Sequence, residues 1–435
     1  MSSDQNGVRR VAVTGMGIVS PCGIGREAYY KSLRDGRSGV SLVGMFDCSN
    51  VSKGVGGEVK DFNDETIKKV HLKELRKSLK VMSRDIQMAM AAAAQAIGES
   101  KLKDSGINPE RVGVEYGANL IFSPPDDLKD GAKACTDDSG QFQMKDWGEK
   151  GLAKMEPLWM LKYLPNMPGC HIAIYADARG PSNSLTLDEA SSGVVLTEAL
   201  RILRRHAADV VITGSTGTRL HPIRAMHAHL WDDVAAIPEA PEKSCKPFDT
   251  KRTGQVIGEA AGCLILEDEE HARKRGAKIY GYMLGGGSSC VLGRDGKPDV
   301  QLAIVNAIRS ALSDAGLKPS DIGHINAHGA GDPEDDRIEA GAIHEVFGEA
   351  GSKIPVASIK GYTGNSGGGS GIVEIAASLL TTAEGLAPKT LNCDEPDPSL
   401  KLNVTRDFTP VANKTFVKIN YTRAGQATAV VFQGV

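Results

Sequence analysis

The chain has 435 residues, of which 41% are hydrophobic and 24% are charged, and its formal net charge is −3. This composition is typical of a folded globular protein, and the near-neutral charge argues against a nucleic-acid partner or an anionic membrane surface. At about 150 residues per domain, the length fits roughly three domains or one large duplicated α/β body.

The sequence also predicts a protein that neither crosses a membrane nor forms disulfides. It contains no run of 18 or more apolar residues, and its first residues, MSSDQNGVRR, lack the apolar core of a signal peptide. The eight cysteines form no CxxC pair and lie too far apart for a zinc site or a disulfide framework. We therefore expect no membrane span, no bound metal, reduced thiols and a cytoplasmic location.

Strand and helix patterns alternate through the first half of the chain. An apolar run punctuated by glycines predicts the first strand, and an alanine-rich segment predicts a buried helix. In chain order the predicted elements are a strand at Val8–Ser20, helices at Arg26–Arg37 and Ser83–Ile97, a strand at 111–120, a helix at Gly193–His206 and a strand at 208–216. Residues 123–150 are polar and rich in turn formers, so they predict an inserted surface loop.

The second half of the chain repeats this plan. Its predicted elements are a strand at 278–287, a helix at 300–316, a strand at 322–331, a strand, glycine-rich turn and helix over 354–380, and strands at 414–421 and 427–433. The repetition indicates a duplicated α/β unit, which we divide within Glu267–Gly276 into an N-terminal half, 1–267, and a C-terminal half, 268–435. Catalytic groups are expected in one cleft, at the carboxyl ends of strands and the N-termini of helices.

Four segments, in this order, carry a resemblance to a known family. They are VAVTGMGIVSPCGIG at 11–25, the block at 247–280 that begins PFDTKRTG, INAHGAG at 325–331 and SIKGYTGN at 358–365. The sequence resembles the elongating β-ketoacyl-acyl carrier protein synthases of fatty acid and polyketide biosynthesis. The resemblance implies an α/β, thiolase-like fold with a duplicated five-layered αβαβα architecture. It also implies acyltransferase chemistry on substrates held by the phosphopantetheine of an acyl carrier protein, with no other cofactor.

In that family a cysteine at a helix N-terminus takes the acyl chain, because the helix dipole favours the thiolate. Two histidines polarise the malonyl thioester, and a lysine holds the histidine network in place. The resemblance assigns the first histidine to His328, in NAHG, and the lysine to Lys360. It places Glu189 at the nucleophile position and Asn365 at the second histidine, so two of the catalytic positions are replaced.

Other positions depart from the family pattern as well. Ala330 and Asp332 replace the threonines that usually grip the phosphopantetheine arm, and NYTRAGQA at 420–427 replaces the gating loop. Glu339 and Asp336 match acidic positions of the family and are expected to support the fold. The cysteine nearest to the nucleophile motif, Cys170, is predicted to lie in the segment that precedes it.

The glutamate changes the chemistry that position 189 allows. A carboxylate is a poor acyl acceptor, because its acyl derivative would be a labile mixed anhydride. Three roles for Glu189 stay open: a helix cap shared with Asp188, an imitation of the thiolate charge that keeps the pocket organised, and a general base. His328 could simply hydrogen bond to backbone, and Asn365 can donate a hydrogen bond but cannot carry a proton as an imidazole does.

These replacements favour a non-elongating subunit, similar to the chain-length factor that forms the cysteine-less half of a heterodimeric ketosynthase. One alternative is a malonyl-acyl carrier protein decarboxylase that supplies an acetyl primer, and another is a divergent 3-oxoacyl-acyl carrier protein synthase that still condenses. The expected partners are an acyl carrier protein and a second subunit, which is either an identical copy or a cysteine-containing ketosynthase.

Overall fold

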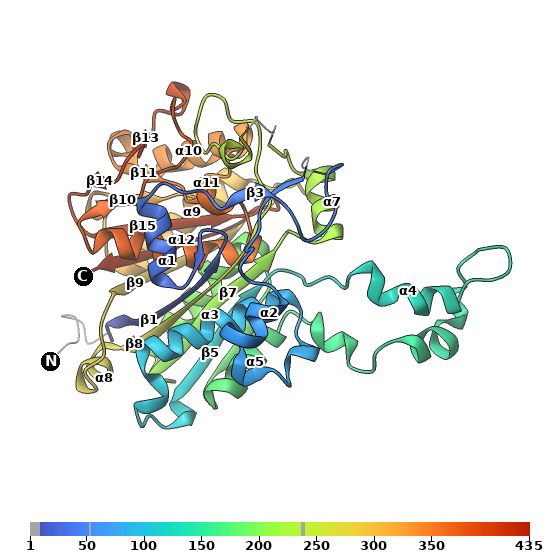
Figure 1. Cartoon of the computed structure of the whole chain (residues 1–435). Coiled ribbons are helices and arrows are strands. Elements are labelled where there is room, and N and C mark those ends of the chain that lie inside the picture. Colours follow the sequence, from blue (N-terminus) through green and yellow to red (C-terminus); the bar gives the residue numbers. More distant parts are fainter. Residues whose placement is uncertain (1–8, 52–53, 236–239) are drawn as a thin grey trace.

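The computed structural model describes residues 9–51, 54–235 and 240–435. Its main feature is one large mixed sheet, in which the two halves of the chain repeat the same strand order (Figure 1). The N-terminal half contributes β1 (Val11–Ser20), β5 (Val112–Ala118), β6 (Ser182–Leu185), β7 (Val210–Thr218) and β8 (Glu259–Asp268). The C-terminal half contributes β9 (Gly281–Cys290), β10 (His324–Asn326), β11 (Pro355–Ala357), β15 (Thr415–Tyr421) and β16 (Gln426–Gly434).

The strand order shows the duplication directly. The N-terminal strands lie in the order β6-β5-β7-β8-β1 and the C-terminal strands in the order β11-β10-β15-β16-β9, with β1 and β9 paired where the halves meet. In each half the first three strands of this order are parallel and the last two pairings are antiparallel. Two copies of one topology therefore face each other. The exact division at residue 267 stays a prediction.

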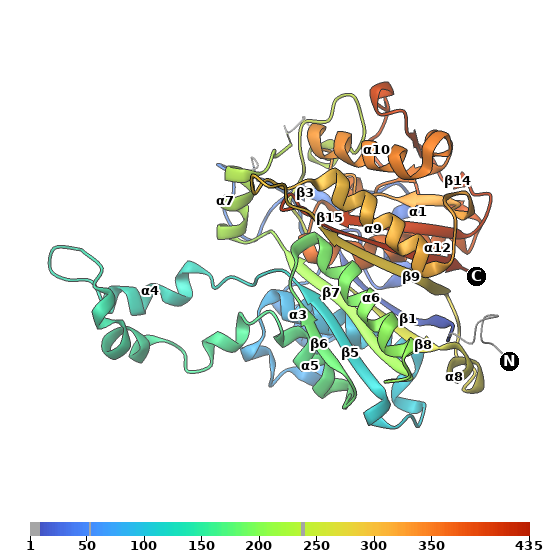
Figure 2. The same ribbon diagram turned by 180° about the vertical axis from the view of Figure 1, so that it is seen from behind.

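Helices fill three layers around these strands (Figures 1 and 2). One outer layer consists of α3 (Arg84–Ser100) and α5 (Met167–Ala176), and the other of α9 (Val300–Ala315) and α10 (Pro333–Phe347). The middle layer consists of α6 (Ser191–Arg204) and α12 (Ser370–Thr382), which contact strands of both halves. This arrangement confirms the predicted thiolase-like, five-layered α/β fold.

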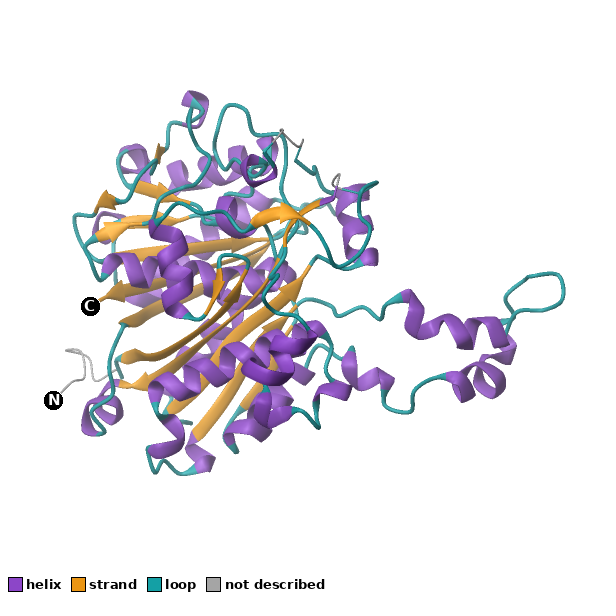
Figure 3. Ribbon diagram, in the orientation of Figure 1, coloured by secondary structure: helices purple, strands orange, loops and turns teal. Residues whose placement is uncertain are grey.

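Shorter elements complete the fold (Figure 3). The helices are α1 (Arg26–Arg34), α2 (Asp64–Thr66), α4 (Pro125–Ala134), α7 (Pro222–Trp231), α8 (Glu269–Lys274) and α11 (Lys360–Thr363). The strands are β2 (Gly23–Ile24), β3 (Val40–Leu42), β4 (Val55–Gly57), β12 (Leu386–Ala387), β13 (Asn403–Val404) and β14 (Thr409–Pro410). The first strand, expected from residue 8, begins at Val11, and Val8 itself lies outside the described residues.

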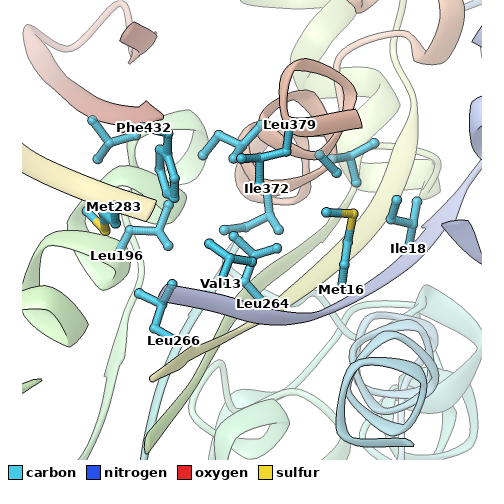
Figure 4. Close-up of a cluster of buried hydrophobic side chains, with 14 of the residues drawn as sticks. Val13, Met16, Ile18, Leu196, Leu264, Leu266, Met283, Ile372, Leu379 and Phe432 are labelled. Atoms are coloured by element: carbon cyan, nitrogen blue, oxygen red, sulfur yellow. The ribbon is translucent and has the colours of Figure 1, made fainter. Parts of the chain in front are cut away.

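The central core lies between the two sets of strands, and Figure 4 shows part of it. On β8, Leu264 and Leu266 point into this core, whereas Cys263 and Ile265 belong to the cluster on the opposite face, under α3. Since helices cover both faces, the strand is apolar at consecutive positions instead of alternating. Each fully buried aliphatic or aromatic side chain contributes about 1.5–3 kcal/mol through removal of apolar surface from water.

Two glycines on β1 explain how closely α3 packs against the sheet. A Cβ atom at Gly17 would lie 1.9 Å from the Ala92 carbonyl oxygen, and one at Gly15 would lie 2.4 Å from that of Ala96. The glycine-punctuated strand and the alanine-rich helix thus form one close contact. At Gly15 and Gly17 of this contact there is no room for any side chain.

Residues 123–150 differ in character from the predicted surface loop. They contain α4 and a series of short helical turns between Met144 and Lys154, and this region projects from the body as an arm (teal in Figures 1 and 2). The Trp147 ring packs against Gly131 and Gly151, next to the buried Cys135. Local packing around one aromatic ring, which polarity alone does not reveal, gives the arm its helical structure.

The described residues contain no helix that is long and apolar enough to cross a membrane.

Candidate active site

The candidate site lies where strands of both halves end and helices begin. Strand β6 leads into the turn Asp188–Ala190 and then into α6, and β10 leads to His328. Strand β11 is followed by Lys360 at the start of α11 and by Asn365 ahead of α12. This position at strand carboxyl ends is the one expected for a ligand site in a fold of this class. The structure joins the four predicted residues as two contacting pairs, Glu189 with Asn365 and His328 with Lys360.

Glu189 is buried, and two side chains contact its Oε1. Its carboxylate forms an ion pair with Arg219, which follows β7, and accepts a hydrogen bond of 3.1 Å from Asn365 Nδ2. The same Nδ2 donates to Gln255 Oε1 at 2.6 Å, and Arg219 Nη1 donates to that oxygen at 3.0 Å. Burial opposes the charge of Arg219, but the carboxylates of Glu189 and Asp232 raise its pKa above the ordinary value. The turn therefore presents a carboxylate that is paired with an arginine.

The neighbouring Asp188 does not cap α6 together with Glu189. Neither the turn nor the helix has a side-chain cap, so the structure does not support the first of the three open roles, a helix cap shared with Asp188. Instead, Asp188 has a left-handed backbone (φ 43°) and forms an ion pair of 3.3 Å with Arg224. Arg224 also lies 4.9 Å from the centre of the Phe122 ring. Two arginines thus hold this strained turn, one through each of its acidic residues.

His328 is buried in a setting that keeps the imidazole neutral. Burial, followed by the charges of Lys360 and Lys418, lowers its pKa well below the ordinary value. Its Nδ1 lies 3.5 Å from Lys360 Nζ and 3.4 Å from Asn420 Nδ2, and both of these groups are hydrogen-bond donors. Nδ1 must therefore be the acceptor, which leaves the imidazole proton on Nε2. The backbone N–H of His328 donates to Glu339 Oε1 at 2.7 Å, so this acidic residue supports the turn as predicted.

Behind the imidazole lies a buried cluster of two lysines and one glutamate. Lys360 forms an ion pair with Glu374 of α12, and Lys418 of β15 contacts the other carboxylate oxygen at 2.7 Å. Burial opposes ionisation of Glu374, but the two ammonium groups hold its pKa below the ordinary value. Burial lowers the pKa of Lys418 to about 8. Sequence reasoning found Lys360 and missed Lys418, although a lysine within the strand sequence KTFVKINY was a visible signal.

Arg219 and Gln255 were also missed. They come from the end of β7 and from the loop before β8, at least 30 residues from Glu189, and nothing in their local sequence marks them as its partners. Asp332, which the resemblance places at a threonine position, is the N-cap of α10 and accepts hydrogen bonds from the backbone N–H groups of Glu334 and Asp335.

The thiols lie elsewhere, and none of the cysteines in the described residues hydrogen bonds to His328. Cys170 is an exposed residue of α5, in the segment before the motif, as predicted. Cys245 lies beside the histidine turn, with its Sγ 3.8 Å from the carbonyl oxygen of Ala330. Burial raises the pKa of Cys245 to about 12, so it is a thiol and not a thiolate nucleophile at neutral pH.

Comparison with known proteins places this geometry in a family. The model of the beta-ketoacyl synthase N-terminal domain matches residues 8–272, and that of the beta-ketoacyl synthase C-terminal domain matches residues 289–394. The 3-oxoacyl-[acyl-carrier-protein] synthase 2 of Synechocystis sp. is 32% identical over 410 residues, covering 94% of this chain and 93% of its own length. The granaticin polyketide putative beta-ketoacyl synthase 1 of Streptomyces violaceoruber is 31% identical over 414 residues, covering 93% and 92%.

Solved structures agree with these matches. The ishigamide ketosynthase/chain length factor superposes with a TM-score of 0.82 at 26% identity, over 98% of this chain and 100% of the other. A type II polyketide ketosynthase solved in complex with its acyl-carrier protein has the same TM-score at 25% identity, with the same coverage. With two family models matched across most of its length and a fold shared with both structures, this chain belongs to the beta-ketoacyl synthase family.

Proposed function

We propose that this chain is a non-elongating subunit of fatty acid or polyketide biosynthesis, which pairs with a cysteine-bearing ketosynthase in the manner of a chain-length factor. The observation that carries this proposal is the ion pair between Glu189 and Arg219 at the turn before α6. The family resemblance puts the acyl-accepting cysteine at this turn. A carboxylate held between an arginine and an asparagine has neither the nucleophilicity nor the stable acyl product that chain elongation needs.

Two exposed features support pairing with a second subunit. Strand β6 ends the sheet on the N-terminal side, and Ser182 and Asn183 at its start are exposed. A free edge of this kind can pair with a strand of another chain. The arm adds apolar side chains that face solvent in the single chain: Phe142, Met144, Leu152, Leu158 and Met160. Several exposed large apolar side chains within one segment are typical of a protein interface.

Co-expression tests this proposal. A tagged copy of this chain is produced with a related ketosynthase whose cysteine is intact, and the purified complex is weighed by native mass spectrometry. We expect a heterodimer. Met144→Asp combined with Met160→Asp should abolish it, because charges would be buried at the interface. Leu302→Asp, on α9 at the opposite outer face, is the matched control and should leave it intact. Recovery of homodimers alone under mild conditions would reject the proposal.

A second candidate is decarboxylation of a malonyl group on an acyl carrier protein. The neutral His328, with its proton on Nε2 and its Nδ1 facing Lys360, favours it, because such a donor stabilises an enolate oxygen. The amide of Asn365 weakens it, since Nδ2 already donates to Glu189 and Gln255. Release of carbon dioxide from the malonyl carrier protein separates the two functions. If the chain is a decarboxylase, it releases carbon dioxide and His328→Ala abolishes this release. If it is a non-elongating subunit, the unmodified chain and His328→Ala show the same background rate.

The third alternative, ordinary condensation, requires an acyl-enzyme intermediate. Among the described residues, Cys245 lies beside the histidine turn, and burial raises its pKa to about 12. A thiol with this pKa is not a thiolate at neutral pH, which weighs against this alternative.

A further inference from the structure

A chain of alternating charges leads away from Glu189. Arg219, the partner of Glu189, also lies 3.6 Å from Asp232 at the end of α7. The other oxygen of Asp232 lies 4.0 Å from Arg423, in the hairpin that joins β15 to β16. Arg423 in turn contacts Asp332 at 3.0 Å, at the start of α10. We call Glu189, Arg219, Asp232, Arg423 and Asp332 the ion-pair chain. Its members come from five separate segments.

The ion-pair chain runs from the interior to the surface. The side chains are 9% exposed at Glu189, 12% at Arg219, 22% at Asp232 and 35% at Arg423. Exposure thus rises at each step from Glu189 to Arg423, so this part of the ion-pair chain leads from the buried carboxylate toward solvent. Asp332 is only 1% exposed and lies beneath Arg423.

Arg423 also fastens its hairpin over His328. Tyr421, two residues earlier, has its ring 4.7 Å from the imidazole and donates its hydroxyl to the Asp335 carbonyl oxygen at 3.0 Å. Arg423 Nε binds both carboxylate oxygens of Asp335, at 3.0 and 3.2 Å. The hairpin is therefore tied to the first turn of α10 by two carboxylates and one backbone acceptor.

We infer that Arg423 is a latch, which keeps the approach to Glu189 and His328 closed to a thioester borne on a long flexible arm. To admit such an arm, the hairpin must part Arg423 from Asp335 and from Asp332. The buried carboxylate of Asp332 would keep its two backbone hydrogen bonds but lose its arginine counter-charge, which is costly. The inference rests on the proposed function only in taking the Glu189 turn as the place where a thioester would arrive. It also predicts that the isolated chain has little decarboxylase activity.

A cysteine placed at the turn can report on access. Glu189→Cys removes the first member of the ion-pair chain but none of the contacts of Arg423 with Asp332 and Asp335. The two exposed native thiols are first removed as Cys170→Ser and Cys290→Ser. The full chain is then treated with a chloroacetamide linked to pantetheine, and the alkylation rate at residue 189 is followed by peptide mass spectrometry.

In this background Arg423→Ala should raise the rate at residue 189 by about tenfold, because alkylation follows the population of the open state. Arg337→Ala is the matched control: it removes an exposed ion pair with Glu334 on α10 and should leave the rate unchanged. Equal rates with and without Arg423 would overturn the latch. This result would leave the subunit proposal intact, since the assay involves no partner.

A second measurement covers the case in which Arg423→Ala fails to fold, as judged by circular dichroism. The rate in the Arg423-intact reporter is then measured at low and at high salt. Since Arg423 is partly exposed, its ion pairs are screened by salt, and we expect the rate to rise. A rate that is already fast at low salt and independent of salt would equally overturn the inference.

Discussion

At the scale of single residues, Glu189 shows how a buried carboxylate is accommodated by its surroundings. A buried carboxylate at position 189 needs counter-charge and hydrogen bonds, and Arg219, Asn365 and Gln255 supply them. His328 and Lys360, which the sequence resemblance predicted as the first histidine and the lysine, contact each other. The site therefore consists of a charge-balanced carboxylate and a histidine–lysine contact.

These contacts predict that removing the carboxylate of Glu189 lowers the free energy of unfolding. Glu189→Ala leaves Arg219 buried with the more distant Asp232 as its carboxylate partner and a neutral acceptor in Gln255, so we expect a loss of about 3 kcal/mol in the free energy of unfolding. Glu65→Ala, which removes an exposed ion pair with Lys69, should cost no more than about 0.5 kcal/mol. Urea unfolding of both variants checks this. Similar losses in both would show that Glu189 is not held as described.

A pH dependence follows from Glu115, a buried residue of β5 whose Oε2 has no hydrogen-bond partner in the described structure. Burial, followed by the charge of Glu198, raises its pKa from 4.5 to about 7. Between these values the unfolded chain releases the proton first, so this residue makes stability fall as pH rises from about 4.5 to 7. Glu115→Gln should therefore stabilise the protein by about 1–3 kcal/mol at pH 8 and have no effect at pH 4.

Thermal unfolding at the two pH values measures this effect. Glu110→Gln, in the exposed turn before the same strand, is the control and should change stability little at either pH. A gain for Glu115→Gln that is the same at both pH values would show that protonation is not its cause.

At the scale of elements, the sequence predicted what local patterns can encode. An apolar run with glycines predicted β1. The alanine-rich composition of the next long segment predicted α3, which packs against Gly15 and Gly17. Motifs marked His328 and Lys360. Partners that come from distant segments, such as Arg219 and Gln255, carry no local signal and needed the fold. The helical arm was missed because its packing depends on one ring, Trp147, among polar neighbours.

The arm predicts a local effect of Trp147→Ala. Without the ring, Gly131 and Gly151 lose their main contact, so α4 should loosen while the five layers stay folded. Limited proteolysis should then cut residues 123–154 at least several-fold faster, with little change in the melting temperature of the body. Trp231→Ala, at an exposed position of α7, is the control and should leave the cleavage rate unchanged. Cooperative loss of the whole fold in Trp147→Ala would contradict an independently packed arm.

At the scale of the whole molecule, duplication explains why the site lies where it does. The repeated strand order brings the turns after β6, β10 and β11 together at the start of the two middle helices, α6 and α12. One half supplies Glu189 and Arg219, and the other supplies His328, Lys360 and Asn365. The duplicated fold thus gathers residues of both halves at one site.

The proposal that this chain accepts no acyl group is tested most directly by the mass of the intact chain after incubation with an acyl-loaded carrier protein. A cysteine-bearing ketosynthase treated in the same way is the positive control. We predict that the control gains one acyl group and that this chain gains none. A stoichiometric acyl adduct on this chain, mapped to any of its residues, would contradict the account and identify a working condensing enzyme.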